Sequence, residues 1–401
     1  MESLIERHNI YLNDTPMDYV RGIMEKIDWN SRLIIIRGPK GVGKSTLLKQ
    51  YIKMHFEEGD EHVLYCSADS SYFSTVSLVD FAMKFHRLGG RYLFFDEIHR
   101  YPNWSREIKE IYDLYSDMHI VLSGSSLIQL NDGTADLSRR MIPYDMPGLS
   151  LREFIRFETG INIEQISLEE LLSKPSAFCS RVCKQCHPLE YFVKYIKGGY
   201  YPFYFEGKRE YAIKVEDVID HIVGRELVEH RNVDAGNVRK IKALLKVISE
   251  MTPYEVDITK LSKAIGMKRE TILRYIHYLE EAKLVMRLYS QLLTVTELQK
   301  PDKLYLDNSN LLYALSSAVP QIGTVRETFL ANQLASAGHK VEYAGYKKGD
   351  FKVDDKIIIE VGGADKGFSQ IAEAENCYVA ADDIESAFMH KIPLWAFGFL
   401  Y

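Results

Sequence analysis

A group of glycines surrounds one lysine and one serine between an apolar segment and a helical pattern. Residues 32–46 read RLIIIRGPKGVGKST, which fits the pattern G-x-x-x-x-G-K-[ST] between a buried strand and a helix. Glycines let successive backbone N–H groups turn toward a phosphate, and the helix N-terminus adds its positive end. The segment therefore predicts a phosphate-binding loop, formed by Gly38, Pro39, Lys40, Gly41, Val42, Gly43, Lys44, Ser45 and Thr46.

Four side chains near this loop have types suited to nucleotide chemistry. Lys44 would contact the β- and γ-phosphates, and the Ser45 hydroxyl would ligate Mg²⁺. Residues 91–100 read RYLFFDEIHR, in which a second apolar run is followed by Asp96 and Glu97. A carboxylate at the end of a buried strand needs a compensating cation, so we expect Asp96 to hold the Mg²⁺ together with Ser45. Glu97 is then the predicted catalytic base that orients the attacking water.

Hydroxyl groups follow the next predicted strand, residues 119–122. This strand runs into Ser123-Gly124-Ser125-Ser126, at the carboxyl edge where open α/β sheets bind ligands. A hydroxyl there could sense the γ-phosphate or the water, with Ser123 the first candidate and Ser125 the second. The same hydroxyls could also cap the following helix, and the two roles are compatible.

The spacing of apolar runs predicts the element that positions these groups. Short runs at 33–36, 63–66, 92–95 and 120–122, with a weaker one at 141–146, alternate with helical patterns. Continuous apolar runs separated by helices are typical of a parallel sheet covered on both faces. We therefore predict an α/β P-loop domain over residues 1–150.

The order of these motifs resembles the AAA-type ATPases of the additional-strand, catalytic-Glu class of bacteria and archaea. The resemblance is to a family whose members carry a C-terminal domain of unknown function related to restriction endonucleases. In that family L-x-G-R is followed, after eight residues, by L-S-F-x-E-F. Here residues 137–140 read LSRR, and residues 149–154, eight residues later, read LSLREF.

The resemblance adds predictions about roles and ligands. Arg140 matches the family arginine and becomes a candidate sensor of the γ-phosphate, in cis or, in a homo-oligomer, in trans. Arg139 replaces the usual glycine, so the two arginines remain alternatives. ATP is implied as the nucleotide by the resemblance, with Mg²⁺ as its metal. The expected activity is hydrolysis of ATP to ADP and phosphate.

Residues 151–236 are predicted to form a helical linker or lid. A Gly/aromatic stretch, GGYYPFYFEG at 198–207, interrupts the helical pattern and is expected to be a hinge or connector. Cys179, Cys183 and Cys186, followed by His187, have the spacing of cluster-binding or haem-attachment motifs but lack their context. We expect the three thiols on one apolar helix face, as small hydrophobic groups.

A winged helix is predicted over residues 237–300. Residues 258–288 read as helix, turn, helix and apolar strand, with a compact apolar core. Residues 238–290 contain 11 Lys plus Arg against 6 Asp plus Glu, on a chain whose formal charge is −6. This permits contact with double-stranded DNA through Lys268, Arg269 and Arg274 on the second helix. Docking of a protein partner is the open alternative.

The last region, residues 301–401, is similar to the PD-(D/E)XK nuclease layout. Glu327, Asp350 and Glu360 match its acidic positions, which gather Mg²⁺ in that family. Gly362 stands where the motif has its lysine, although Lys366 could reach in from the following loop. We therefore predict a small α/β restriction-endonuclease-like domain without nuclease activity, used for structure or docking.

Composition narrows the class of protein. The chain has 401 residues, enough for two or three domains, with 46% hydrophobic and 26% charged residues. We expect it to be cytoplasmic and without a membrane partner, because its start lacks a signal peptide and no long apolar run is present. The main hypothesis is an ATPase that moves its C-terminal half. The alternative is an ATP-gated binding switch with slow turnover.

Overall fold

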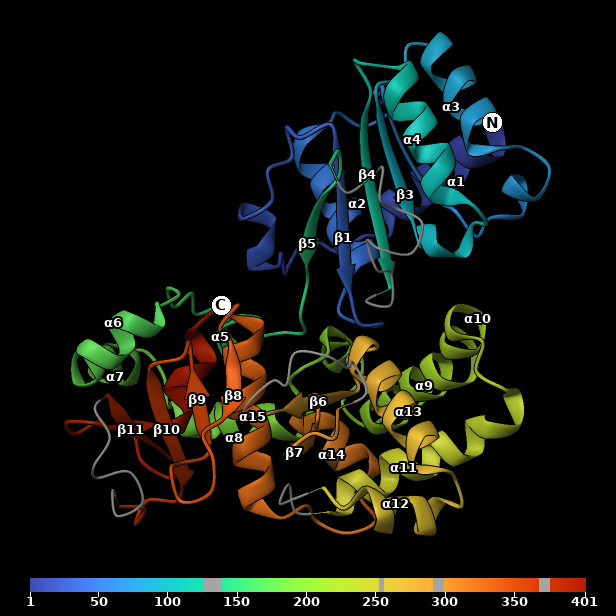
Figure 1. Cartoon of the computed structure of the whole chain (residues 1–401). Coiled ribbons are helices and arrows are strands. Elements are labelled where there is room, and N and C mark those ends of the chain that lie inside the picture. The colour runs from blue at the N-terminus through green and yellow to red at the C-terminus, as the bar shows by residue number, and fades with distance from the viewer. Residues whose placement is uncertain (126–136, 138, 252–255, 291–298, 368–375) are drawn as a thin grey trace. The chain divides into compact units, whose positions relative to one another are not determined.

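The chain folds into two compact units in a computed structural model. The structure describes residues 1–125, 137, 139–251, 256–290, 299–367 and 376–401. The first unit is Met1–Pro147 and the second is Gly148–Tyr401 (Figure 1). Among the described residues, no helix is both long enough and apolar enough to cross a bilayer.

The first unit is built on five parallel strands in the order β2-β3-β4-β1-β5. This confirms the predicted parallel sheet. The strand β4 lies between β1 and β3. The strands are β1 (Leu33–Gly38), β2 (Val63–Ser67), β3 (Tyr92–Asp96), β4 (His119–Ser125) and β5 (Ile142–Asp145).

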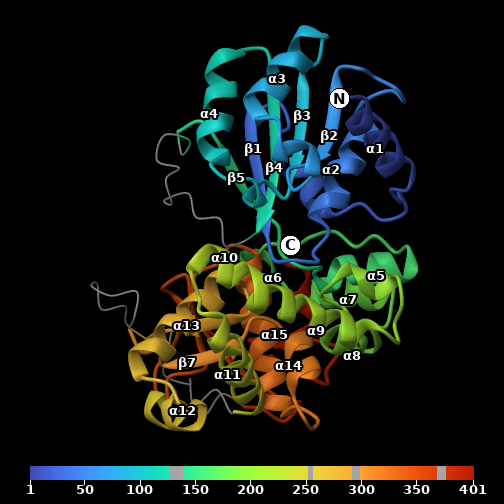
Figure 2. The same cartoon turned by 90° about the vertical axis from the view of Figure 1, so that its right-hand side faces the viewer.

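Helices cover both faces of this sheet. One face packs its apolar side chains under α3 (Leu78–Arg87) and α4 (Trp104–Leu114). Because side chains alternate along a strand, the intervening residues point to the other face. There α2 (Lys44–His55) contacts β1 and β4 (Figure 2). The Tyr51 ring of α2 lies 5.9 Å from the Phe94 ring of β3. The strands β1 to β4 are thus buried on both sides, as their continuous apolar runs predicted, whereas β5 is mostly exposed.

The central strand β4 is longer than the sequence predicted. It continues to Ser125 because its pairing with β1 runs on to the last pair, Gly38 with Ser125. Asp96 ends the neighbouring strand β3. The phosphate loop, the acidic pair and the serines therefore meet at the same carboxyl edge.

The first helix, α1 (Glu2–Asn13), closes the free edge of β2. Its His8 is buried, and its Nδ1 accepts a hydrogen bond of 2.9 Å from the Tyr65 backbone N–H. Burial lowers the pKa of His8 to about 4, because the charged ring would lose its hydration. A neutral His8 therefore satisfies a donor that an edge strand would otherwise leave unpaired.

We expect acid to destabilise the first unit through His8. The unfolded imidazole, with a pKa near its usual 6.5, binds a proton that the folded one, with a pKa of about 4, excludes. The free energy of unfolding should therefore fall by about 3 kcal/mol as the pH drops from neutrality to 4. Urea unfolding of wild type and His8→Gln across this range measures the difference. His55→Gln, at an exposed histidine, is the control, and parallel curves for wild type and His8→Gln would contradict the assignment.

The second unit begins with a helical part. Its helices are α5 (Leu151–Thr159), α6 (Leu168–Ser173), α7 (Pro175–Cys183), α8 (Pro188–Gly198), α9 (Tyr211–His221) and α10 (Leu227–Arg231). The C-terminal residues pack on this part, since Arg152 of α5 donates to the Tyr401 carbonyl and Gln165 to the Leu400 carbonyl. The predicted linker and the last region therefore share one core.

The Gly/aromatic stretch at 198–207, predicted to be a hinge or connector, packs against the core of the second unit. Tyr200 and Tyr201 are almost fully buried, and Asn310 accepts a hydrogen bond from the Tyr200 backbone N–H. Its aromatic side chains are the reason, because their large apolar area is most stable inside the core. The stretch joins α8 to α9 as a packed connector.

The cysteines are only partly placed as expected. The helix α7 ends at Cys183, so Cys186 lies beyond it and the three thiols do not share one helix face. Cys179 and Cys186 are buried, whereas Cys183 is half-buried. Burial raises the pKa of Cys179 to about 12 and that of Cys186 to about 11, so these thiols stay protonated at neutral pH.

The remaining elements form two further groups. The first comprises α11 (Val238–Glu250), α12 (Ile258–Ile265), α13 (Arg269–Glu281) and an antiparallel hairpin of β6 (Val285–Leu288) and β7 (Lys303–Leu306). The second has α14 (Ser309–Leu315), α15 (Ile322–Ser336) and a mixed sheet, β12-β11-β10-β9-β8. Its strands are β8 (Val341–Tyr343), β9 (Phe351–Val353), β10 (Ile357–Gly362), β11 (Cys377–Ala381) and β12 (Lys391–Pro393).

Candidate functional site

The phosphate loop connects β1 to α2. Gly38 ends β1, and Lys44 is the first residue of α2. Gly41 and Gly43 adopt φ values of 86° and 97°, in the left-handed region where glycine is the least strained residue. The Lys44 ammonium folds back over the loop and donates to the Gly38 and Pro39 carbonyls at 2.8 and 2.9 Å. The Lys44 side chain thus bonds to the backbone at the start of the loop.

The loop is held from both ends by the chain around it. A Cβ on Gly38 would lie 2.2 Å from the Met146 carbonyl oxygen, so this position accepts only glycine. Arg21 donates to the Val42 carbonyl at 2.8 Å and to the Pro147 carbonyl at 3.0 Å. This role of Arg21 was not predicted, because the residue lies well outside the motif.

Asp96 is buried at the end of β3, with both carboxylate oxygens engaged. One oxygen accepts a hydrogen bond of 2.6 Å from the Tyr65 hydroxyl, and the other accepts one from the Ser123 hydroxyl. Ser123 is fully buried and its oxygen also accepts the Glu97 backbone N–H at 3.1 Å. Ser123 therefore positions the acidic pair, and its contact with a phosphate or a water stays a prediction. Tyr65 was not predicted, because a tyrosine in a buried strand carries no motif.

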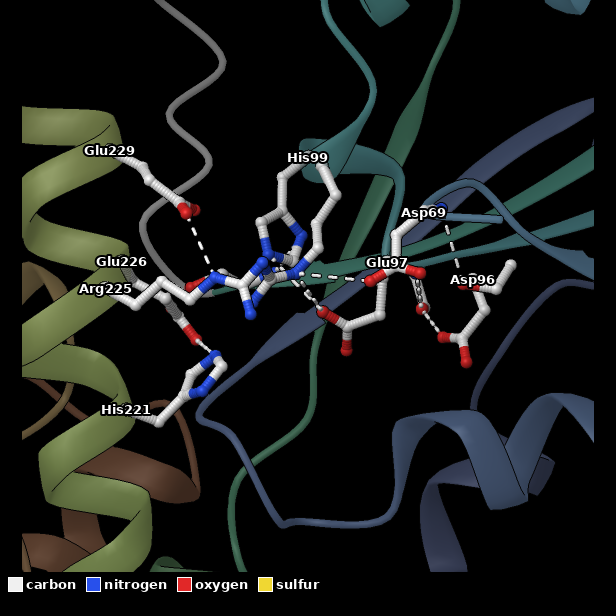
Figure 3. Close-up of polar contacts among 12 residues, drawn as sticks. Asp69, Asp96, Glu97, His99, His221, Arg225, Glu226 and Glu229 are labelled. Carbon is white, nitrogen blue, oxygen red and sulfur yellow. Dashed lines mark hydrogen bonds and ion pairs between the residues drawn. The ribbon is translucent and has the colours of Figure 1, made fainter. Parts of the chain in front are cut away.

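Glu97 is set by the backbone and by two basic side chains. Its φ of 52° is in the left-handed region, which turns the carboxylate out of the strand direction. Its Oε2 lies 3.4 Å from His99 Nε2 and 3.8 Å from Arg100 Nε (Figure 3). His99 Nδ1 accepts from the Ser125 backbone N–H at 3.3 Å, so in the neutral ring the proton is on Nε2, facing Glu97. His99 thereby connects the end of β4 to the predicted base.

Arg140 lies away from the phosphate loop within its own unit. Its guanidinium is paired with Asp113 of α4 at 3.1 Å. The C-terminal end of α4 lies at the start of β1, where Arg32 donates to the Tyr112 and Tyr115 carbonyls. Arg140 is therefore at the opposite edge of the sheet from Gly38, and its predicted cis contact with the γ-phosphate has no support. A role in trans stays a prediction, and Ser126 and Ser138 lie outside the described residues.

A second set of charged side chains lies in the C-terminal part. Lys303 of β7 is 3.1 Å from Glu327 of α15 and 3.1 Å from Asp350, which precedes β9. Tyr305 donates to the same Glu327 oxygen at 2.5 Å. Burial alone would lower the Lys303 pKa, but the two carboxylates outweigh it and raise the pKa, so the ammonium is charged at neutral pH.

Glu360 completes this cluster and is paired with a different lysine. Its Oε1 is 2.5 Å from the Lys366 ammonium, while its Oε2 is buried without a hydrogen bond. The Lys366 side chain fills the space beside Gly362, where an added Cβ would lie 2.6 Å from Lys366 Cβ. The structure thus places Lys366 at the acidic cluster, as the sequence allowed. The contact of Lys303 with these acids was not predicted.

Two family models match parts of the chain. Residues 30–155 match an AAA domain family, and residues 189–321 match a family described only as a domain of unknown function. The first match covers β1 to β5, with the phosphate loop and the acidic pair. This part of the chain is therefore similar to AAA domains. Its five parallel strands flanked by helices are the fold expected of a P-loop NTPase.

One curated relative has no known function. The chain is 24% identical over 272 residues to the uncharacterized protein MJ1544 of Methanocaldococcus jannaschii. The matched segment covers 64% of this chain and 56% of that relative. The chain therefore spans little more than half the length of the relative.

Several solved structures share a weak overall likeness. RuvB of Thermotoga maritima is 18% identical, with 72% of this chain and 89% of that chain covered and a TM-score of 0.27. The ORC1 protein of Aeropyrum pernix in complex with DNA is 12% identical, with 78% and 91% covered and a TM-score of 0.32. AMPPCP-bound DnaA from Aquifex aeolicus is 19% identical, with 65% and 85% covered and a TM-score of 0.27. At these scores nothing further about this chain follows from the likeness.

Proposed function

We propose that the chain is a Mg²⁺-dependent ATPase whose AAA-type domain drives movement of the C-terminal unit. One observation carries the proposal. At the end of β3, beside β4 and the phosphate loop, Asp96 is buried between two hydroxyl donors and Glu97 turns out of the strand. Asp96 is thus a buried carboxylate held by hydroxyl groups, and a second acid follows it at the carboxyl edge of the sheet. Such a pair of acids suits a nucleotide-bound metal and the attacking water.

The donor set around the loop fits a magnesium nucleotide. Ser45 on α2 and Asp96 on β3 supply the hydroxyl and carboxylate oxygens that Mg²⁺ prefers. When bound, Mg²⁺ supplies positive charge to the β- and γ-phosphate oxygens. Lys44, now bonded to two loop carbonyls, would turn to the phosphates, and Glu97 would orient the water and accept its proton. The test is release of phosphate from ATP by the full chain, with and without Mg²⁺.

A specific observation supports the alternative, an ATP-gated switch with slow turnover. The Glu97 carboxylate lies between His99 and Arg100, so its negative charge is partly compensated. A carboxylate held by neighbouring side chains is less free to turn toward a water. Turnover would then require a partner that draws these groups away. Stimulation by a partner would support the ATPase; binding without turnover under every condition would support the switch.

We further propose that residues 237–300 form a winged helix and that its partner is double-stranded DNA. The order α11, α12, α13 and then the β6–β7 hairpin supports the first part, while residues 291–298, in the predicted wing, lie outside the described residues. On α13 and just before it, Lys268, Arg269 and Arg274 are all exposed. A recognition helix that carries free basic groups at its start can contact phosphates and base edges.

We expect neutralisation of these three side chains to weaken binding to duplex DNA. Lys268→Gln, Arg269→Gln and Arg274→Gln together should reduce the slope of log affinity against log salt by about three. Fluorescence anisotropy of a labelled duplex over a salt series measures it. A matched control neutralises three exposed residues outside this region, Arg181, Lys184 and Lys197. Equal losses in both variants would place the DNA elsewhere, and no binding by wild type would favour a protein partner.

A further inference from the structure

The acidic cluster of the C-terminal part already contains a cation that belongs to the chain. The Lys303 side chain is 6% exposed, and its ammonium lies 3.1 Å from both Glu327 and Asp350. Three aromatic rings surround it, with the Tyr343, Phe351 and Tyr305 ring centres at 5.0, 5.7 and 5.9 Å. An ammonium that is close to two carboxylates and to three aromatic rings is held by ion pairing and by cation–π attraction.

This lysine comes from another element than the acids. Lys303 is the first residue of β7, in the β6–β7 hairpin, whereas Glu327 lies on α15 and Asp350 precedes β9. The hairpin is docked on the edge of the mixed sheet, because the Tyr343 backbone N–H donates to the Tyr289 carbonyl at 3.0 Å. The docked hairpin therefore delivers the ammonium into the cluster.

Four carboxylate oxygens of the cluster contact groups of the chain, whereas Glu360 Oε2 is buried without a hydrogen bond. The two acids beside Lys303 share its ammonium, and the second Asp350 oxygen accepts the Val361 backbone N–H at 2.9 Å. Glu360 uses one oxygen for Lys366. Within the residues that the structure describes, no group of three or more His, Cys, Asp or Glu side chains is placed to hold a metal ion. The residues present do not fit the divalent cation that the nuclease resemblance implies.

We propose that the Lys303 ammonium is the resident cation of this cluster and takes the position of a divalent metal. The cluster then serves to fasten the β6–β7 hairpin to the mixed sheet. Removing one partner of a buried ion pair leaves an uncompensated charge, which destabilises the fold or draws in another cation. This inference is independent of ATP hydrolysis.

The test is Mn²⁺ binding by the nucleotide-free full chain, counted from the loss of the free Mn²⁺ signal in electron paramagnetic resonance. Wild type should bind no Mn²⁺ that depends on Asp350. Lys303→Met should bind Mn²⁺ at least about tenfold more tightly, because carboxylates are good ligands for a hard cation. Adding Asp350→Asn should abolish the gain. Lys352→Met, at a lysine on β9 that pairs with Asp355, is the control and should behave as wild type.

Two results would overturn the proposal. The first is Mn²⁺ binding by wild type that Asp350→Asn removes; the second is a folded Lys303→Met that binds no more Mn²⁺ than wild type. Where Lys303→Met does not fold, the charge-balanced Lys303→Met/Glu327→Gln decides. This double variant should regain cooperative unfolding, because the neutral Gln at position 327 removes the negative charge that Lys303 compensated. A double variant as unstable as the single one would show that Lys303 is not the charge partner of the cluster.

Discussion

Replacing Lys44 by alanine should remove ATP binding, whereas Glu97→Gln should leave binding intact and remove turnover. Lys44 is the ammonium beside the phosphate loop, at the start of α2. Without it, the β- and γ-phosphates lose their nearest positive side chain, and the loop amides alone hold the nucleotide weakly. We expect the affinity for ATP to fall at least about a hundredfold.

The Glu97 variant separates binding from chemistry. Glutamine has nearly the same shape as glutamate but cannot take a proton from water. Because a positioned base contributes about 10² to 10⁴ in rate, turnover should fall by that factor while the affinity for ATP stays within about threefold of wild type. Glu97→Gln also removes a negative charge beside His99 and Arg100. Because this charge would repel the phosphates, the affinity for ATP should rise slightly.

Matched variants separate these effects from general damage. Lys53→Ala changes a lysine on the same helix as Lys44, nine residues further on, and Glu110→Gln changes an exposed glutamate of α4. Both should bind and hydrolyse ATP as wild type does. The measurements are equilibrium binding of a fluorescent ATP analogue and phosphate release under single turnover. Undiminished turnover in Glu97→Gln would remove Glu97 as the base, and undiminished binding in Lys44→Ala would move the nucleotide site away from the loop.

The sequence was most informative where one short segment contains both the structure and the chemistry. The phosphate loop is such a case, because Gly38 to Ser45 are contiguous and their residue types dictate a turn before a helix. The end of β3 is another, since an uninterrupted apolar run before Asp96 marks a buried parallel strand. The number of strands in the sheet of the first unit, and their approximate positions, followed from the apolar runs of residues 1–150.

Contacts between distant segments were beyond reach of the sequence. One of the two hydroxyls that donate to Asp96 comes from Tyr65, on a strand whose sequence pattern is only apolar. Arg140 was placed at the phosphate because it matches a family position, yet its partner Asp113 lies at the other edge of the sheet. Lys303 reaches its acids only because the β6–β7 hairpin docks on the mixed sheet. Periodicity reports which face of an element is buried, and it does not report which element covers it.

Loss of the Asn310 side chain should be among the most destabilising single changes in the second unit. Asn310 on α14 is 1% exposed, and its Nδ2 donates to the Tyr195 and Ile196 carbonyls, both at 3.0 Å. Its Oδ1 accepts the Tyr200 backbone N–H at 2.8 Å and also the Tyr211 hydroxyl. The Asn310 amide thus provides hydrogen-bond partners for buried polar groups at the end of α8, in the aromatic connector and on α9.

Truncation to alanine removes these four hydrogen bonds and leaves their partners buried. An unsatisfied buried group costs about 1 to 3 kcal/mol, so Asn310→Ala should lower the free energy of unfolding by about 3 to 5 kcal/mol. Asn310→Leu distinguishes lost hydrogen bonds from lost volume. It refills the space, so a loss as large as that of alanine assigns the cost to the hydrogen bonds, whereas recovery of stability would assign it to a cavity.

The measurement is urea unfolding of the full chain, with Gln185→Ala at an exposed site of the same unit as the control. The control should lie within about 0.5 kcal/mol of wild type. If Asn310→Ala were as stable as the control, the connector would not depend on α14 and could move as a hinge after all. If it is strongly destabilised, α8, the connector and α9 unfold together with α14. Any movement that ATP drives in the second unit must then carry these elements as one body.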